Sequence, residues 1–217
     1  MSAFEFGVDE AGKGPVLGPM VAACVVGPTD ELPDGIDDSK ALTAQTRTEL
    51  ATRIRSDSAF DVGVARISTD TIDDPDTDMN TLTVVAHANA IDGALDGGSK
   101  TAGVLDGADT DADRFARRVG DRVDAQLTVH AEHGGDERYP IVGAASVIAK
   151  VERDRAVATI AEEYGDVGSG YPGDPTTRSF LETYVETHGE LPDCARSSWK
   201  TATDIVASVE QTTLDSL

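Results

Sequence analysis

The sequence has little that would cross-link the chain, bind a soft metal or enter a membrane. Its 217 residues include only two cysteines, Cys24 and Cys194, which lie far apart and lack the spacing of zinc ligands. Two buried, inert thiols are therefore expected instead of a disulfide framework. No basic segment followed by an apolar one marks a secretory signal, and no run approaches the roughly 18 apolar residues of a membrane span. These absences predict a cytoplasmic protein.

Positive charge is also scarce. The chain carries 40 Asp and Glu against 18 Lys and Arg, which gives a formal net charge of −22 at pH 7, and few of the basic residues are lysine. A hydrophobic content of 39% argues against a disordered acidic chain, so the spread of acidic residues indicates a halophilic protein. Because the Debye length in molar salt is only about 3 Å, this net charge does not exclude a nucleic-acid partner.

Hydrophobic periodicity predicts an α/β protein. The pattern indicates strands at 3–9, 18–27, 59–67, 102–107 and 125–133, and helices at 43–56, 81–95, 112–123, 142–164, 176–188 and 199–209. Early strands joined by short turns, followed by strands that alternate with helices, favour a mixed sheet flanked by helices. We expect a domain over residues 1–164, with a helical segment at 165–217 packed on it.

The segment GVDEAGKGPVLGP, residues 7–19, places Asp9 and Glu10 beside a glycine-rich turn. The turn lacks the spacing of a phosphate-binding loop, and Pro15 removes an amide that such a loop would use. A glycine-rich turn alone is more often structural than functional. Adjacent carboxylates point to opposite faces of a strand, so both reach one site only near the strand's end. Since crowded carboxylates need a neutralising cation, the pair favours a metal site.

Two more aspartates follow apolar strands. Asp106 ends the run VLD, and Asp136 comes after the last expected strand, just before the longest expected helix. Either one alone is more simply a turn residue or a helix cap. Together the four carboxylates form an all-oxygen set suited to Mg²⁺ or Mn²⁺ at the strand ends. The histidines fit no strong pattern, and the spacing of His130 and His133 is interpreted as incidental.

Six motifs occur in a fixed order along nearly the whole chain. They are GVDEAGKGPVLGPMV, DDSKALT, VLDGAD, GDERYPIVGAASVIAKVERDRAV, GSGYPGDP and RSSWKT. In this order the chain resembles the type 2 ribonucleases H, the ribonuclease HII family in its archaeal form. The resemblance implies a ribonuclease H-like, mixed five-stranded sheet flanked by helices, with a C-terminal helical subdomain. A type 1 enzyme is disfavoured because its motifs differ. A type 3 enzyme is disfavoured because it would carry a long extension before the first motif, which here starts at residue 7.

The resemblance also implies roles for individual residues. The metal-binding catalytic carboxylates of the family correspond to Asp9, Glu10, Asp106 and Asp136. The family's Gly-Arg-Gly turn, whose backbone contacts the 2′-hydroxyl beside the scissile phosphate, corresponds to Gly12, Lys13 and Gly14, where lysine lacks the planar fork of arginine. Its tyrosine that stacks beside the ribonucleotide corresponds to Tyr171. Positions that meet the substrate backbone correspond to Ser39, Lys40, Ser146, Lys150 and Arg196, each of which could equally be a solvated surface group.

The implied activity is hydrolysis of the RNA strand in RNA/DNA hybrids and cleavage at ribonucleotides embedded in duplex DNA, in DNA replication and repair. Bound Mg²⁺ or Mn²⁺ would orient the attacking water, leaving 3′-hydroxyl and 5′-phosphate ends. The alternative is a hybrid-binding protein of the same fold that has lost cleavage. We expect a monomer. Residues 211–217, QTTLDSL, begin like a sliding-clamp motif but lack its aromatic pair. They predict weak or no clamp binding, or simply a frayed helix end.

Overall fold

The computed structural model describes residues 5–36, 42–95, 101–123 and 127–215, and side chains as far as residue 211. The strands are β1 (Phe6–Ala11), β2 (Met20–Val26), β3 (Asp61–Ile67), β4 (Thr101–Asp106) and β5 (Leu127–Glu132). The helices are α1 (Ala44–Ser56), α2 (Thr69–Ile72), α3 (Met79–Asp92), α4 (Ala112–Gly120), α5 (Gly135–Arg138), α6 (Pro140–Tyr164), α7 (Pro175–His188) and α8 (Lys200–Asp215), with a short 3-10 turn η1 (Thr29–Glu31).

The five strands form one mixed sheet in the order β3-β2-β1-β4-β5. The β1–β2 and β2–β3 pairs are antiparallel, whereas the β1–β4 and β4–β5 pairs are parallel. The predicted mixed five-stranded sheet flanked by helices is confirmed. The sequence pattern missed α2 and α5, because a four-residue helix is too short to show a helical period.

The structure groups the chain into two compact units that are interleaved in the sequence. The catalytic unit, as we call the first, comprises Met1–Ala11, Met20–Ile67 and Asp78–Glu152, and it contains the sheet. The second unit, which we call the clamp-turn unit because it contains the glycine-rich turn, comprises Gly12–Pro19, Ser68–Thr77 and Arg153–Leu217. A domain boundary at residue 164 stays a prediction. No helix in the described part of the chain is long and apolar enough to cross a membrane.

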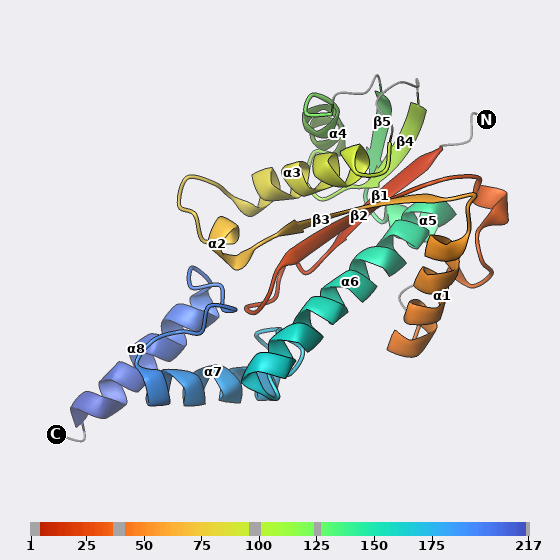
Figure 1. The fold of residues 1–217 in the computed structure, drawn as a ribbon. Helices are drawn as coiled ribbons and strands as arrows, with labels where there is room; N and C mark the ends of the chain where they lie inside the picture. The colour runs from red at the N-terminus through yellow and green to blue at the C-terminus, as the bar shows by residue number, and fades with distance from the viewer. Residues whose placement is uncertain (1–4, 37–41, 96–100, 124–126, 216–217) are drawn as a thin grey trace. The chain divides into compact units, whose positions relative to one another are not determined.

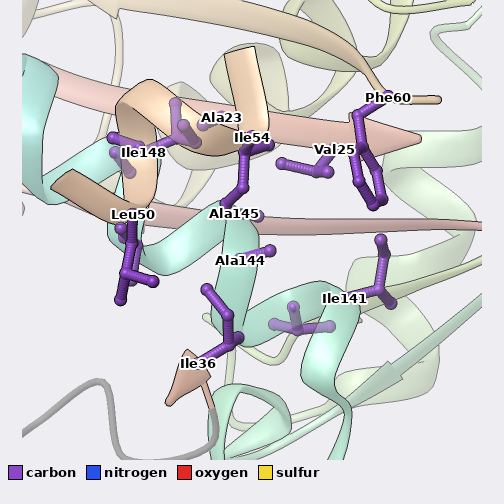
Figure 2. Close-up of a cluster of buried hydrophobic side chains, with 14 of the residues drawn as sticks. Ala23, Val25, Ile36, Leu50, Ile54, Phe60, Ile141, Ala144, Ala145 and Ile148 are labelled. Carbon is purple, nitrogen blue, oxygen red and sulfur yellow. The ribbon is translucent and has the colours of Figure 1, made fainter. Parts of the chain in front are cut away.

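Within the catalytic unit, helices cover both faces of the sheet, α3 and α4 on one and α1 with the start of α6 on the other (Figure 1). Figure 2 shows the core on the second face, where side chains from β2, α1 and α6 interdigitate. Its buried members include Ala23, Val25, Leu50, Ile54, Ile141 and Ile148. Cys24 is buried in the same strand, and burial raises the pKa of its thiol, as expected for an inert cysteine.

A glycine lets α6 pack closely against the central strand. A Cβ atom on Gly7 would lie 2.6 Å from backbone atoms of both Ile141 and Val142. Real Cβ contacts do not come that close, so any larger residue would push the start of α6 away from β1. The same helix carries Ser146 toward the sheet, and α5 precedes it directly in the chain. Gly7 therefore sets the spacing on which the carboxylate site depends.

The clamp-turn unit has its own core. Leu17, Leu181, Val185 and Ile205 are buried together, and Cys194 is buried beside them. Helix α7 begins with Asp174, whose carboxylate accepts a hydrogen bond from the Thr176 amide, followed by a proline in its first turn. Leu17 also forms a β-bridge with Ala195, which joins the glycine-rich turn to the RSSWKT segment.

Candidate active site

Two of the predicted carboxylates lie where the parallel pairing of the central strands ends. The last paired residues of β1 and β4 are Val8 and Leu105. Asp9 and Asp106 come next in each chain segment, just past the last parallel pair of these neighbouring strands. This is where ligands of open α/β sheets gather, because the backbones diverge there.

Glu10 differs from Asp9 in the face that it presents. The backbone does not turn after Glu10, because β1 continues through Ala11, which pairs with Val21. Strand alternation therefore holds: the Asp9 carboxylate lies toward Ser146 of α6, whereas Glu10 reaches His87 of α3. Both acids nevertheless interact electrostatically with Asp106. The adjacent carboxylates therefore both lie near Asp106 although they point to opposite faces of β1.

Asp136 reaches the same site from the short helix α5. Gly134 precedes that helix at a φ of 67°, a left-handed conformation that favours glycine. The next amide, that of Gly135, donates a 2.7 Å hydrogen bond to Oδ1 of Asp106. Asp136 is buried. Burial raises the pKa of Asp106, and the negative charge of Asp136 contributes to the same shift. The α5 turn thus ties the fourth carboxylate to the third.

The four acids crowd negative charge into the interior. Burial raises the pKa of Asp9 well above its usual value, and the charges of Glu10 and Asp106 raise it further. Burial also raises the pKa of Asp106, although the Gly135 amide opposes the shift. Within the described residues, no lysine or arginine forms an ion pair with either aspartate. A bound cation would lower the cost of this arrangement.

The donor set suits a hard divalent cation. Carboxylate oxygens are the ligands that Mg²⁺ and Mn²⁺ prefer, and neither cysteine lies among them. Among the described residues, no three His, Cys, Asp or Glu side chains close around one point as they stand. The fit to a hard divalent cation therefore rests on the chemistry of the carboxylate donors.

Ser146 corrects one of the predicted substrate contacts. Its side chain is completely buried on α6, so it does not offer its hydroxyl to a bound nucleic acid. The hydroxyl has no hydrogen-bond partner of normal geometry, yet it lies close enough to Asp9 to lower the pKa of that carboxyl. Ser146 therefore belongs with the carboxylates instead of with the substrate backbone.

The structure also corrects the predicted substrate contact at Arg196. Its side chain is fully buried, and its guanidinium donates hydrogen bonds to backbone oxygens of the glycine-rich turn, at 2.6 Å to Gly12, 3.0 Å to Lys13 and 2.9 Å to Gly18. Burial lowers its pKa to about 10, and the nearby charge of Arg153 adds to that shift. An arginine committed in this way does not meet a substrate phosphate; it fixes the shape of the turn.

The turn itself presents exposed backbone. Gly12 adopts a φ of 85°, which only glycine takes readily. Gly14 is exposed, and a Cβ atom there would meet nothing within 4 Å. Trp199 approaches from one side, with its indole nitrogen 3.4 Å from the Gly14 oxygen and its ring 5.0 Å from the Arg196 guanidinium carbon. Open space over Gly14 allows close approach of a ligand to the backbone.

Tyr171 is an exposed aromatic residue whose ring packs against the buried Arg153. Its side chain is 45% exposed, and the guanidinium carbon of Arg153 lies 5.0 Å from its ring centroid. Arg153 is buried and donates a hydrogen bond to the Ser169 oxygen. Such an arrangement leaves an aromatic surface that a sugar or base can stack on. Lys13 and Lys150 are half-buried, while Ser39 and Lys40 lie outside the described residues.

His87 is a site residue that the sequence pattern does not reveal. It lies in the middle of α3, has no exposed surface, and places Nε2 at 2.8 Å from Oε2 of Glu10. A single histidine in an apolar helix has no recognisable spacing to an acid 77 positions earlier. His133, interpreted as incidental, contacts the Gly107 oxygen at 2.9 Å, next to Asp106 in the chain.

The sheet order and the strand-end carboxylates define a nuclease of the ribonuclease H class, and comparisons with known proteins agree. The ribonuclease HII family model matches residues 6–202. A ribonuclease HII of the halophile Haloarcula marismortui is 57% identical, covering 96% of this chain and 98% of the relative. The chain belongs to the ribonuclease HII family and is a metal-dependent endoribonuclease from a halophile.

Solved structures support the same fold. The ribonuclease H2 of Pyrococcus horikoshii superimposes with a TM-score of 0.86 at 36% identity, covering 95% of this chain and 98% of that one. The ribonuclease HII of Archaeoglobus fulgidus, solved as a complex with PCNA, gives a TM-score of 0.81 at 37% identity over 92% and 95% of the two chains.

Proposed function

We propose that this enzyme cuts the RNA strand of RNA/DNA hybrids and also cuts at single ribonucleotides embedded in duplex DNA, leaving 3′-hydroxyl and 5′-phosphate ends. The observation that carries the proposal is a set of four neighbouring acids whose charges repel: Asp9, Glu10 and Asp106 on the strands and Asp136 on α5. Acids in that state suit a reaction that needs a bound divalent cation. The activity would serve DNA replication and repair in the cytoplasm.

The four carboxylates would hold Mg²⁺ or Mn²⁺. Bound there, the metal supplies a polarised water and stabilises charge that develops on the phosphate. The chain itself contributes fixed orientation. The Oδ1 atoms of Asp9 and Asp106 each accept a backbone hydrogen bond of 2.7 Å, from the amides of Glu10 and Gly135 respectively. Held in this way, each carboxylate keeps one orientation while the substrate binds.

The clamp-turn unit would recognise the ribonucleotide. Gly12, Lys13 and Gly14 follow Glu10 closely in the chain, and the open space over Gly14 suits backbone contact with a 2′-hydroxyl. Such a hydroxyl both donates and accepts hydrogen bonds, which distinguishes RNA from DNA. Tyr171 would stack on the neighbouring sugar, and the half-buried Lys150 would meet a phosphate. Ser39 and Lys40 remain proposed phosphate contacts from sequence.

One assay tests the proposal. A duplex with one embedded ribonucleotide and a continuous RNA/DNA hybrid are incubated in molar KCl with Mg²⁺, with Mn²⁺ and with a chelator. Metal-dependent nicking is expected on both substrates, and the nicked strand should be extended by a DNA polymerase without end repair, which reports a 3′-hydroxyl. The downstream fragment should be ligatable, which reports a 5′-phosphate.

Binding without cleavage would instead support the non-catalytic alternative. Cleavage in the chelator, or ends that need repair before extension, would contradict the metal-assisted reaction. Glu49→Gln provides a control, since Glu49 is an exposed acid on α1 that bonds only to Gln45 among the contacts described. It should cleave like the parent enzyme.

A sliding-clamp contact is a weaker part of the proposal. The Archaeoglobus fulgidus relative forms a complex with PCNA. In this chain α8 continues to Asp215, so the sequence QTTLD is helical as far as the structure describes it. The missing aromatic pair removes the apolar anchors of such a motif. We propose a monomer with weak clamp contact at most.

A further inference from the structure

We propose that His87 positions Glu10 for metal binding, a role that rests on the metal-dependent function proposed above. Its Nε2 lies 2.8 Å from Oε2 of Glu10, and the imidazole has no exposed surface. This pair connects α3 to β1 across the face of the sheet that Asp9 does not use. In this proposal His87 acts through its contact with Glu10, so it is a positioning residue.

The surroundings of the ring decide which nitrogen carries the proton. Within the described structure, Nδ1 is buried and has no hydrogen-bond partner. A proton on Nδ1 alone would leave a buried donor unpaired and would set a lone pair of Nε2 against the carboxylate. The proton therefore lies on Nε2, which donates to Oε2 of Glu10. The ring also packs edge-to-face against Phe115 of α4, with centroids 5.1 Å apart.

Glu10 needs such a partner more than the aspartates do. A glutamate has an additional side-chain torsion, so its carboxylate explores more positions and loses more entropy when a metal fixes it. Asp9 and Asp106 are fixed by backbone amides, at 2.7 Å each. The contact between His87 and Glu10 comes from a side chain instead. A substitution can therefore remove it without altering the strand.

The donor can be removed while a ring remains. His87→Phe keeps an aromatic ring against Phe115 but donates nothing to Glu10. His87→Gln places an amide N–H at a similar reach and should restore the contact. Loss of a partner that orients a metal ligand typically weakens metal binding about tenfold or more. Phe115→Leu serves as the matched control, because it disturbs the same packing without touching Glu10.

The readout is Mn²⁺ binding to the substrate-free protein, followed by electron paramagnetic resonance of the free ion in molar KCl. We expect the dissociation constant to rise about tenfold in His87→Phe, to return to within about threefold of the parent value in His87→Gln, and to stay unchanged in Phe115→Leu. In cleavage assays, His87→Phe should need more Mg²⁺ for half-maximal rate while approaching the parent rate at saturating Mg²⁺.

Two results would overturn the inference: parental Mn²⁺ affinity in His87→Phe, or equal weakening in His87→Phe and Phe115→Leu, which would indicate general packing. If His87→Phe does not fold, as judged by circular dichroism, His87→Leu is measured against His87→Gln by the same criteria. The proposed function fails separately, if the parent protein binds Mn²⁺ in a His87-dependent way but cuts neither substrate.

Discussion

Buried charged side chains have different kinds of partner in the two units. In the catalytic unit, burial raises the pKa values of Asp9 and Asp106, and the charges of neighbouring carboxylates raise them further. Among the described residues, no lysine or arginine forms an ion pair with either aspartate. In the clamp-turn unit, the buried Arg196 donates hydrogen bonds to three backbone oxygens. These two aspartates thus lack an arginine or lysine partner in the described structure, whereas the Arg196 guanidinium is hydrogen-bonded within the fold.

This difference suits the carboxylates to metal-dependent chemistry and the arginine to holding the backbone in shape. Uncompensated carboxylates cost stability but remain able to bind a cation, which is what a metal-dependent reaction requires. The Arg196 guanidinium, hydrogen-bonded to three backbone oxygens, rigidifies the backbone around it, and its complete burial keeps it from a ligand. Removing an acid should therefore affect activity more than folding. Removing the arginine should affect folding first.

The largest expected effect is the loss of cleavage in Asp136→Asn. The change keeps the size of the side chain and removes one negative charge from the site, so the fold and hybrid binding should persist. Loss of one metal ligand should lower kcat by at least roughly a hundredfold, since several kcal/mol of charge stabilisation depend on the bound metal. Nicking assays at saturating Mg²⁺ measure it, and near-parental cleavage would show that Asp136 has no catalytic role.

Arg196→Met should cost stability. The methionine fills much of the volume but leaves the oxygens of Gly12, Lys13 and Gly18 without their donor. The free energy of unfolding should fall by about 3 kcal/mol, as for other buried acceptors that lose a charged partner. Denaturant titration in molar KCl measures this. Arg178→Met is the control, because Arg178 is exposed and pairs only with Glu182 along α7 in the ion pairs described, so it should change stability by under about 1 kcal/mol.

Tyr171→Ala should change substrate preference. Without the ring, cleavage at a single embedded ribonucleotide should fall roughly tenfold, a typical cost of losing one aromatic stacking surface. Cleavage of a continuous hybrid should fall less, since no RNA–DNA junction has to be recognised there. Tyr171→Phe retains the ring over Arg153 and should retain stacking. Equal losses on both substrates in Tyr171→Ala would remove the junction-sensing role.

The fold could be predicted from the sequence to a large extent. Strand and helix ranges agree with the structure within a few residues, because the apolar periodicity of the buried elements is strong. Helix α8 is longer than expected, and it begins at Lys200 and ends at Asp215. Short elements were missed, and α5 is the important one, since it carries Asp136.

The site was predicted less completely. Asp9, Glu10 and Asp106 were predicted from their places at or near the ends of apolar strands, and Asp136 from its place after the last strand; their catalytic role stays a prediction. Ser146 and Arg196 were predicted as substrate contacts, but sequence carries no direct signal of burial for a polar residue inside a motif. His87 was missed for a related reason. Its partner, Glu10, lies on β1, and only the packing of α3 on that strand brings the two side chains together.

Asp73 provides a smaller, pH-dependent effect in the clamp-turn unit. Burial alone would raise the pKa of Asp73, but hydrogen bonds from the backbone and hydroxyl groups of Ser198 and Ser197 lower it below its usual value of 3.8. A depressed pKa in the folded state stabilises the protein above the unfolded pKa. That contribution is lost as the pH falls below about 4.

The measurement is the free energy of unfolding against pH for the parent and Asp73→Asn. The two proteins should differ by no more than about 1 kcal/mol near pH 7, because Asp73 is partly exposed and solvent screens its interactions. The difference should shrink on acidification. A difference that grows as the pH falls would contradict the sign argued for this carboxylate.

The smallest expected effect comes from deleting residues 211–217. Gln211 is exposed near the end of α8, and the QTTLDSL segment lacks the aromatic side chains that would anchor it in an apolar pocket. Deletion should leave hybrid cleavage unchanged and should not measurably alter binding to the sliding clamp of a halophilic archaeon, followed by surface plasmon resonance in molar KCl. Gln211→Ala tests the polar part of the motif alone, without shortening the helix. Micromolar affinity that disappears on deletion would show that this segment is a clamp-binding motif despite its missing anchors, and a parallel loss in Gln211→Ala would assign the contact to that glutamine.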